Sequence, residues 1–215
     1  MRLRSVNVGR QESIDHGNRT FVTGICKRPS DGSVHIGYDL VAGDTICNTE
    51  HHGGKDQVAY AYSTEDYDWW SAELDTELQP GAFGDNLTID GLPTDLYVGD
   101  RLLIGDVLLE ATSPRIPCST LAARMQDSGF GVQFRKAERP GIYFRVLNEG
   151  EVSAGDGVTL IENPVPVVSI LELFRLSYDL SPDPADLERY LEAPLAERFR
   201  AKLEQKLAAA GSSAA

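Results

Sequence analysis

Long apolar segments are missing from this chain of 215 residues, which contains no run of about 18 apolar residues. A transmembrane helix needs a run of roughly that length, so the sequence predicts none. The first ten residues, MRLRSVNVGR, also lack the apolar core of a secretion signal. We therefore expect a soluble, cytoplasmic protein that has no membrane partner.

Positive charge is scarce, because 20 lysines and arginines stand against 33 aspartates and glutamates, giving a formal net charge of −13. Phosphate backbones and anionic membrane surfaces repel a protein of this charge. The deficit is concentrated in residues 1–164, which hold 25 acidic and 14 basic residues. The composition argues against a nucleic-acid partner, and it makes any basic cluster within residues 1–164 informative.

Cysteine is rare, since the chain has only Cys26, Cys47 and Cys118, far apart in the sequence. An odd number of cysteines without a secretion signal argues against a disulfide framework. The signatures GxxxxGK[ST], GxGxxG after a strand, and GxSxG are all missing. Their absence excludes a P-loop ATPase, a Rossmann nicotinamide site and an α/β-hydrolase.

Short β-type segments separated by glycine, proline and aspartate fill the chain up to residue 164. Many short strands with frequent turns favour a closed or nearly closed β-barrel over a βαβ sheet. One helix is expected within this region, capped by Ser63 and carrying Tyr67, Trp70 and Leu74 at helical spacing as core residues. The predicted strands are 21–26, 35–40, 57–62, 102–104, 107–112, 142–146 and 158–161.

The last part of the chain has helical periodicity and is predicted to form a small three-helix segment over residues 165–210. Ser169 and Glu172 have capping-box spacing before 170–178, Asp183 precedes a proline at a first helical position, and a third helix starts at Pro194. Residues 211–215 are expected to form a disordered tail. No catalytic residue types cluster in this segment, so it is interpreted as structural or as a docking surface for a partner.

The segment Ser113-Pro-Arg-Ile-Pro-Cys118 is the first candidate for chemistry. Its two prolines stiffen the loop around Arg115 and Cys118. The nearby arginine favours the thiolate form of the cysteine, which attacks electrophiles and binds soft metals. The alternative is that Cys118 is a small buried apolar residue.

The segment Glu50-His-His52-Gly-Gly-Lys-Asp56 is the second candidate. Two glycines after a histidine let the backbone approach a ligand closely, His52 can donate to an anionic group, and Asp56 can orient it. A tight Gly-Gly turn with solvated histidines explains the segment equally well.

Two further segments carry polar groups suited to an anionic ligand. Lys27 and Arg28 form a basic pair after a predicted strand and could hold a phosphate, although such a pair is usually a solvated surface. Asn86 lies in the glycine-bracketed loop 81–87, where it either binds a ligand or satisfies a turn.

Taken in order, the segments KRP, HHGG, GDNL and PRxPC resemble the MOSC domain family, named for the C-terminal domain of molybdenum cofactor sulfurases. The resemblance is to stand-alone bacterial members of the YiiM type and covers about residues 20–163, followed by the three-helix segment. It implies a mainly β fold, a MOSC-type β-barrel over residues 1–164, that binds the molybdenum cofactor, a pterin dithiolene with a phosphate. It also implies that Cys118 is the catalytic residue and molybdenum ligand, and that the cofactor-binding residues are Lys27, Arg28, His52, Asp56, Asn86 and Arg115.

The activity implied by this resemblance is the reduction of N-hydroxylated compounds, such as hydroxylamino-purines and amidoximes, as in the amidoxime-reducing members of the family. Because no flavin, nicotinamide or iron–sulfur motif is found, a separate electron-donor protein is required. The alternative is a non-catalytic cofactor carrier, or a sulfur carrier that uses a Cys118 persulfide. The sequence leaves a homodimer open.

This chain departs from the family pattern at three positions. Asp85 replaces a glutamate before Asn86, Lys55 replaces a proline, and His51 precedes His52. These changes bear on the substrate preference more than on cofactor binding.

Overall fold

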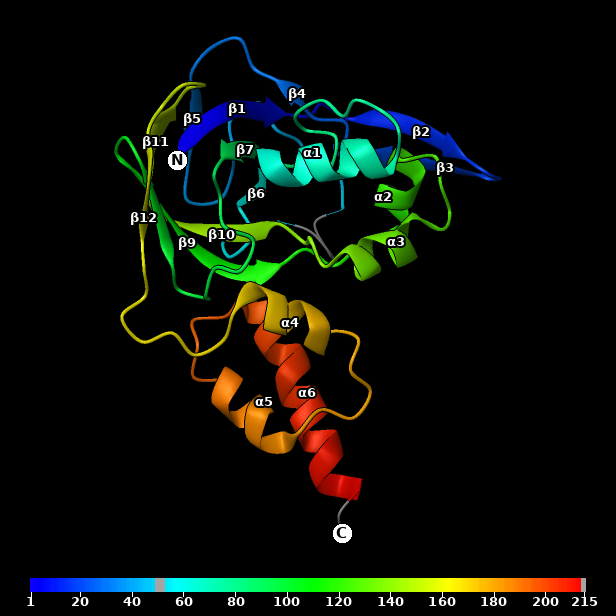
Figure 1. Cartoon of the computed structure of the whole chain (residues 1–215), viewed down its shortest axis with the longest axis vertical. Coiled ribbons are helices and arrows are strands. Elements are labelled where there is room, and N and C mark those ends of the chain that lie inside the picture. Colours follow the sequence, from blue (N-terminus) through cyan, green and yellow to red (C-terminus); the bar gives the residue numbers. More distant parts are fainter. Residues whose placement is uncertain (49–52, 214–215) are drawn as a thin grey trace.

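The computed structural model describes residues 1–48 and 53–213, and it has an eight-stranded sheet with helices on its flank and at its C-terminal end (Figure 1). The strands of this sheet are β1 (Arg2–Val8), β4 (Arg28–Pro29), β6 (Ala59–Ser63), β7 (Leu87–Asp90), β8 (Arg101–Ile104), β9 (Val107–Pro114), β10 (Ile142–Asn148) and β12 (Val158–Ile161). Their order is β12-β8-β9-β10-β6-β7-β1-β4. Among the hydrogen-bonded pairs, β6 and β7 run parallel and the others are antiparallel.

The main sheet curls strongly, but it does not close into a barrel within the described residues. Its two ends are β12 and β4. β1 approaches the start of β12 through one isolated bridge between Arg2 and Gly157, next to a turn at Gly155, whose φ is +99°. Backbone hydrogen bonds flank this bridge, from the Leu3 amide to the Asp156 oxygen at 2.9 Å and from the Val158 amide to the Met1 oxygen at 3.1 Å, but the described strands form no ladder between β1 and β12. The mainly β prediction is confirmed, whereas the closed barrel stays unconfirmed.

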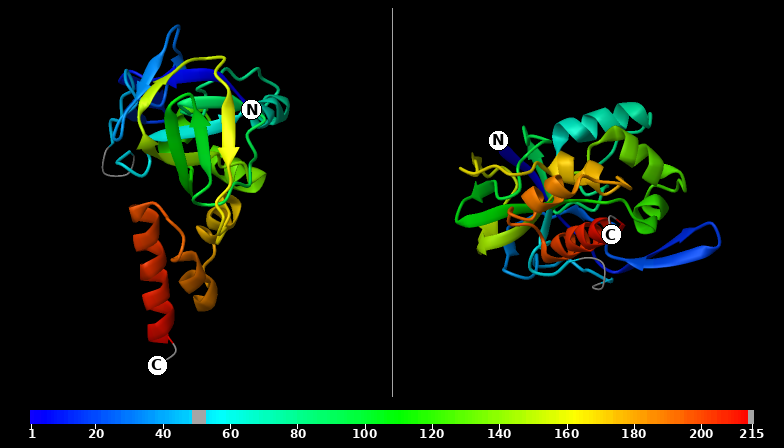
Figure 2. Two further views of the ribbon diagram at one scale, coloured as in Figure 1. Left: turned by 90° about the vertical axis from the view of Figure 1, so that its left-hand side faces the viewer. Right: turned by 90° about the horizontal axis from the view of Figure 1, so that it is seen from below.

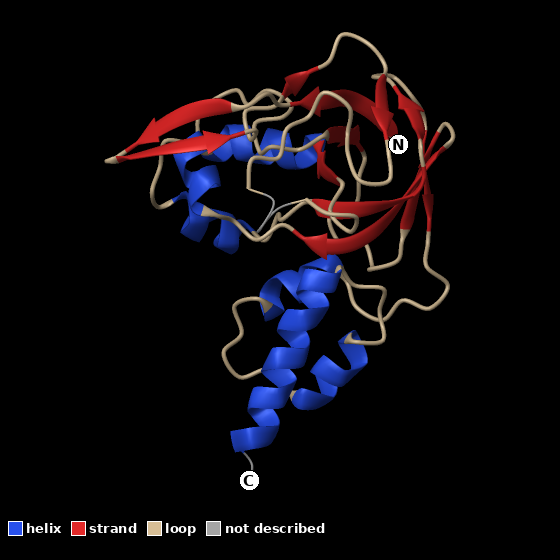
Figure 3. Cartoon of the chain, turned by 180° about the vertical axis from the view of Figure 1, so that it is seen from behind, coloured by secondary structure: helices blue, strands red, loops and turns tan. Residues whose placement is uncertain are grey.

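Two small sheets lie outside the main one. β5 (Val34–Ile36) pairs with β11 (Gly150–Val152), and β2 (Glu12–His16) pairs with β3 (Arg19–Thr23). The β2–β3 hairpin projects from the body of the molecule, beside the helices that follow β9 (Figure 3). The hairpin is tied to that side by Gln126, which donates a hydrogen bond to the backbone oxygen of Asp15 at 3.1 Å.

Three helices cover one flank of the sheet: α1 (Thr64–Glu73), α2 (Ser119–Arg124) and α3 (Phe130–Ala137). Ser63 caps α1 as predicted, since its hydroxyl accepts from the Asp66 amide at 2.9 Å. Tyr67 and Trp70 are buried in an aromatic cluster, which confirms that they are core residues. The sequence predicted one helix here, because α2 and α3 are too short to show clear periodicity.

The C-terminal helices are α4 (Ile170–Leu176), α5 (Pro184–Tyr190) and α6 (Glu197–Ser213), and they pack below the sheet (Figures 1 and 2). The predicted capping box of Ser169 and Glu172 is present, and Asp183 caps α5 with Pro184 at its first turn. The last helix begins at Glu197 rather than at Pro194 and continues to Ser213, into the predicted tail.

One apolar core runs through both the sheet and the C-terminal helices. Leu109 on β9 and Phe144 on β10 are fully buried in the same cluster as Leu173 on α4 and Leu187 on α5. Burial of such side chains stabilises the fold by roughly 1.5–3 kcal/mol each. The C-terminal helices therefore share the core of the sheet and do not form a second core of their own.

Candidate functional site

A cavity of about 400 Å³ opens between the β2–β3 hairpin, the end of β9 and the loops around residues 44–48 and 84–86. Four of the seven residues predicted for the site line it, although they come from distant parts of the chain: Lys27, Asn86, Arg115 and Cys118. This convergence identifies the cavity as the candidate functional site.

Cys118 lies at the N-terminal end of α2, just after the proline-rich loop that leaves β9. Its backbone is extended, with φ −122° and ψ 169°, and its side chain is partly exposed and lines the cavity. The start of a helix and the neighbouring Arg115 place positive charge near the thiol. The alternative of a fully buried apolar cysteine describes Cys26 better, since Cys26 is buried and burial raises the pKa of its thiol.

Arg115 is a buried cation that faces the cavity, with 5% of its surface exposed. Its guanidinium carbon lies 5.1 Å from the centre of the Tyr60 ring, and its buried Nε has no hydrogen-bond partner among the described residues. Burial alone would lower the pKa of Arg115, but Tyr143, Tyr60, Cys118 and Asp85 outweigh it and raise the pKa. The guanidinium is therefore permanently charged, and its Nε–H is buried without a protein partner in the described part of the chain.

Lys27 is also buried, and its ammonium group forms an ion pair with Asp44. Burial lowers the pKa of Lys27, while the Asp44 carboxylate opposes that shift. Asp44 also accepts hydrogen bonds from the Asn86 side chain at 3.0 Å and from the Gly9 amide at 2.8 Å. Because Asp44 neutralises Lys27, Arg115 is the stronger attraction for an anion inside the cavity.

Asp44 is a residue of the site that was not predicted from the sequence. The residue follows Gly43, which has a φ of +79°. This Gly-Asp pair is of the same kind as the Gly-Asp pairs that mark turns elsewhere in the chain. The Gly-Asp pair could have indicated a turn at this position. It did not indicate that the Asp44 carboxylate would contact Lys27.

The loop before β7 holds Asn86 and Asp85 in different roles. Asn86 accepts a hydrogen bond from the Tyr60 amide at 3.2 Å and faces the cavity. Asp85 is fully buried, and its carboxylate accepts from the Tyr67 hydroxyl at 2.5 Å and the Thr88 hydroxyl at 2.7 Å. Burial raises the pKa of Asp85 above its ordinary value, although these hydrogen bonds oppose the shift. Asp85 thus anchors the loop that presents Asn86.

Three predicted residues are not brought to the cavity. Arg28 is on the exposed surface, where it pairs with Glu12. Asp56 faces the C-terminal helices instead. His52, together with its neighbour His51, lies outside the described residues. Although Arg28 follows Lys27 directly, it starts β4 with an exposed side chain, whereas the Lys27 side chain is buried.

The hairpin supplies a wall of the cavity that the sequence did not predict. Residues Thr20, Phe21, Val22 and Thr23 on β3 line it, as does Cys47. The sequence predicted a strand at 21–26, but its pairing with β2 in a separate hairpin at the cavity depends on tertiary contacts that the local sequence does not specify.

The described part of the chain contains no group of three or more histidine, cysteine, aspartate or glutamate side chains placed to hold a metal ion. None of its helices is both long enough and apolar enough to cross a membrane.

Comparison with known families gives two matches along the chain. The MOSC domain matches residues 48–159, and the YiiM-like 3-alpha helix domain matches residues 168–210. The first covers the β9 strand, Arg115 and Cys118, and the second covers helices α4 to α6.

Comparison with individual proteins gives similarity along nearly the whole chain. YflK of Bacillus subtilis is 31% identical over 204 residues, covering 94% of this chain and 92% of YflK. A protein named Reductase from Gibberella moniliformis is 31% identical over 179 residues, covering 81% of this chain but only 32% of that longer protein. The crystal structure of YiiM from Geobacillus stearothermophilus superposes with a TM-score of 0.80 at 28% identity, covering 96% of this chain and 98% of that one.

Proposed function

Because this chain belongs to the MOSC domain family and carries the YiiM-like three-helix domain, we propose that it is a molybdenum-cofactor-dependent oxidoreductase. Its proposed substrates are small N-hydroxylated compounds, such as hydroxylamino-purines and amidoximes, which it reduces to the amine or amidine. The observation that carries the proposal is the meeting of the Cys118 thiol and the buried, unsatisfied Arg115 guanidinium in one cavity.

The residues of the cavity fit the molybdenum cofactor by their chemistry. A thiolate is a soft ligand suited to a soft metal, and a buried guanidinium with a vacant N–H is suited to a phosphate or to pterin heteroatoms. When bound, the cofactor would supply two-electron oxygen-atom transfer at molybdenum.

The protein residues would bind and orient the reactants. Cys118 would be the protein ligand to the metal, and Arg115 would hold the phosphate or the pterin. Asn86 would hold Asp44 in place at the cavity wall, and Lys27, already paired with Asp44, would contribute less than Arg115. His52 stays a predicted ligand, whereas Arg28 and Asp56 are no longer proposed to bind the cofactor.

The hairpin and the overall charge favour a small substrate. The β3 residues cover part of the cavity with both apolar and hydroxyl groups, which suits a planar heterocycle with polar edges. The net charge of −13 disfavours polynucleotides, so a hydroxylamino-purine would be bound as a free base or nucleoside.

The reduction consumes two electrons and two protons, breaks the N–O bond and releases water. No electron-carrying motif is found in the sequence, so we propose that a separate donor protein supplies the electrons. The relative named Reductase supports an oxidoreductase, and this chain spans about a third of that protein.

An anaerobic assay tests the proposal directly. Protein loaded with molybdenum is mixed with a reduced viologen dye and 6-hydroxylaminopurine, and adenine is measured by chromatography. We expect 6-hydroxylaminopurine to be converted to adenine while the reduced dye is oxidised. Loaded protein that gives no turnover contradicts the enzyme and favours a cofactor carrier, and cyanide-labile sulfur on metal-free protein would favour a sulfur carrier.

A further inference from the structure

The first turn of α6 is hydrogen-bonded to residues 53–57, a segment whose two ends line the cavity. We propose that the C-terminal helices act as a clamp that positions this segment, with Arg198 as a positioning residue, and that cofactor binding and docking of α6 therefore favour each other. The coupling to the cofactor rests on the proposed function, whereas the clamp itself does not.

Two contacts join α6 to the segment directly. Nη1 of Arg198 donates to the backbone oxygen of Gly53 at 3.3 Å, and the backbone amide of Glu197 donates to Oδ2 of Asp56 at 2.8 Å. The amide of Glu197 belongs to the first turn of the helix, where amides have no partner within the helix. The Asp56 carboxylate satisfies one of them, and its negative charge is favourable at the positive end of the helix.

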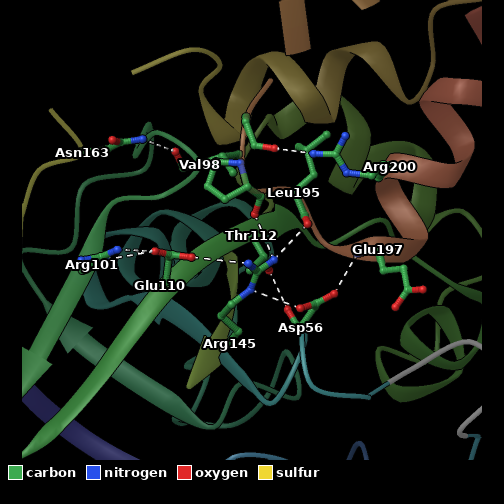
Figure 4. A network of polar contacts seen from close by, with 12 residues as sticks. Asp56, Val98, Arg101, Glu110, Thr112, Arg145, Asn163, Leu195, Glu197 and Arg200 are labelled. Atoms are coloured by element: carbon green, nitrogen blue, oxygen red, sulfur yellow. Dashed lines mark hydrogen bonds and ion pairs between the residues drawn. The ribbon is translucent and has the colours of Figure 1, made fainter. Parts of the chain in front are cut away.

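A network of polar contacts connects Asp56 to the sheet as well (Figure 4). Nε of Arg145, on β10, lies 3.2 Å from Oδ1 of Asp56. The same guanidinium donates to the backbone oxygens of Pro194 at 3.0 Å and Leu195 at 2.9 Å, just before α6. The hydroxyl of Thr112, on β9, donates to the backbone oxygen of Asp56 at 2.6 Å. Asp56 is thus shared between the sheet and α6.

The segment needs outside support because its own backbone provides little. Gly53 has a φ of +72° and Gly54 a φ of +85°, and glycines lose more conformational entropy on ordering than other residues. Beyond them, Gln57 and Val58 line the cavity, and Gln57 donates to the Ser113 hydroxyl at 3.2 Å. A ligand that contacts Gln57 and Val58 binds more tightly when the segment is held in place. By thermodynamic reciprocity, binding of that ligand strengthens the docking of α6.

Arg200 supplies a matched control on the same helix. Like Arg198, it donates to backbone oxygens, in this case those of Leu191 and Ala193, each at 2.8 Å. These acceptors follow α5 and lie outside the cavity lining. Arg200→Ala therefore weakens the helical segment without removing a contact to residues 53–57.

Hydrogen exchange of the cofactor-free protein tests the clamp. We expect Arg198→Ala to speed exchange of the amides of residues 53–58 about three- to tenfold through loss of the hydrogen bond to Gly53, while Arg200→Ala leaves those amides unchanged. Arg198→Lys, which keeps one donor and the charge, should restore most of the protection. Equal acceleration in the two alanine variants, or none in either, overturns the clamp.

Retention of the cofactor tests the coupling. The proteins are produced in a host that makes the cofactor and are then dialysed. The pterin that remains bound is measured by its fluorescence after the protein is denatured. We expect Arg198→Ala to lose pterin about three- to tenfold faster than Arg200→Ala, and identical rates overturn the coupling. If wild-type protein contains no pterin, the proposed function fails, while hydrogen exchange still decides the clamp.

Discussion

Buried charges at single residues set the properties of the cavity. Arg115 retains its charge with one N–H unsatisfied, whereas the charge of Lys27 is compensated by Asp44. An anion entering the cavity therefore meets a net attraction dominated by Arg115. This explains how a protein with a net charge of −13 is suited to a small anionic ligand.

The buried carboxyl of Asp85 predicts a pH dependence of stability. Burial raises its pKa above the ordinary value of about 3.9, so the folded state holds the proton at pH values where the unfolded chain has released it. The stability that this group contributes is full below about pH 4 and is lost as the pH rises through the folded pKa. We expect the free energy of unfolding of the wild type minus that of Asp85→Asn to fall as the pH rises from about 4 to 7. Urea unfolding of both proteins measures this difference, and an increase with pH would contradict the assignment.

Substitution of Cys118 separates the metal site from the fold. Serine is a good residue at the start of a helix, so Cys118→Ser should change the free energy of unfolding by less than about 0.5 kcal/mol. The same variant should lose most of its molybdenum, because a hydroxyl is a poor substitute for a thiolate. Thermal denaturation and elemental analysis provide the two measurements. Cys47→Ser is the control, because Cys47 lines the same cavity and this variant should retain its molybdenum. Full molybdenum content in Cys118→Ser would exclude Cys118 as the ligand.

The sequence predicted which residues line the cavity best where neighbouring residues fix the position of the side chain. Cys118 and Arg115 belong to one rigid loop, so their joint position follows from the two prolines between and beside them. Arg28 and Asp56 were assigned from neighbours in the sequence, but tertiary partners, Glu12 and Arg145, determine where their side chains lie. Such partners are far away in the sequence and leave no local signal.

Among the elements, the β2–β3 hairpin lines the cavity, whereas the first turn of α6 contacts the segment 53–57, whose ends line it. The predicted segment 158–161 coincides with β12, and 107–112 and 142–146 lie within β9 and β10, because aliphatic and aromatic residues predominate in these strands despite polar residues such as Thr159 and Arg145. The N-terminal strands β1 and β2 were missed, since their apolar residues are interrupted by charged ones such as Arg4 and Asp15. Their strand structure depends on pairing with distant segments.

The capping box of α4 predicts a measurable loss on one substitution. The Ser169 hydroxyl accepts from the Glu172 amide at 3.1 Å, and the Glu172 carboxylate accepts from the Ser169 amide at 2.7 Å. Ser169→Ala should lower the free energy of unfolding by about 1 kcal/mol. Ser177→Ala, at the other end of the same helix, should cost less than about 0.5 kcal/mol, because there the hydroxyl adds a bond to the already bonded oxygen of Leu173. Chemical denaturation measures both, and equal losses would contradict the role of the cap.

In the molecule as a whole, the C-terminal helices and the sheet are joined by backbone hydrogen bonds and a shared apolar core. The Val98 amide donates to the Val168 oxygen at 3.0 Å, and the Ala196 amide donates to the Thr112 oxygen at 3.2 Å. These bonds join the two parts next to their shared apolar core. The sequence predicted a separate segment from its change in periodicity, but periodicity carries no information on how closely two segments pack.

Shared packing predicts a single unfolding transition for the full chain. Calorimetry should give one peak whose van't Hoff enthalpy equals the calorimetric enthalpy. The physical reason is that loss of α4 would expose Leu173 and the sheet residues that contact it. Two resolved transitions would show that the sheet and the helices unfold independently.

The most direct test of the proposed function is the molybdenum and pterin content of the purified wild-type protein. The protein is produced once in a host that makes the molybdenum cofactor and once in a host that lacks its synthesis, and both preparations are analysed for metal and for pterin fluorescence after denaturation. We predict near-equimolar molybdenum and pterin in the first preparation and neither in the second. Protein from the first host that contains neither molybdenum nor pterin would contradict the proposal.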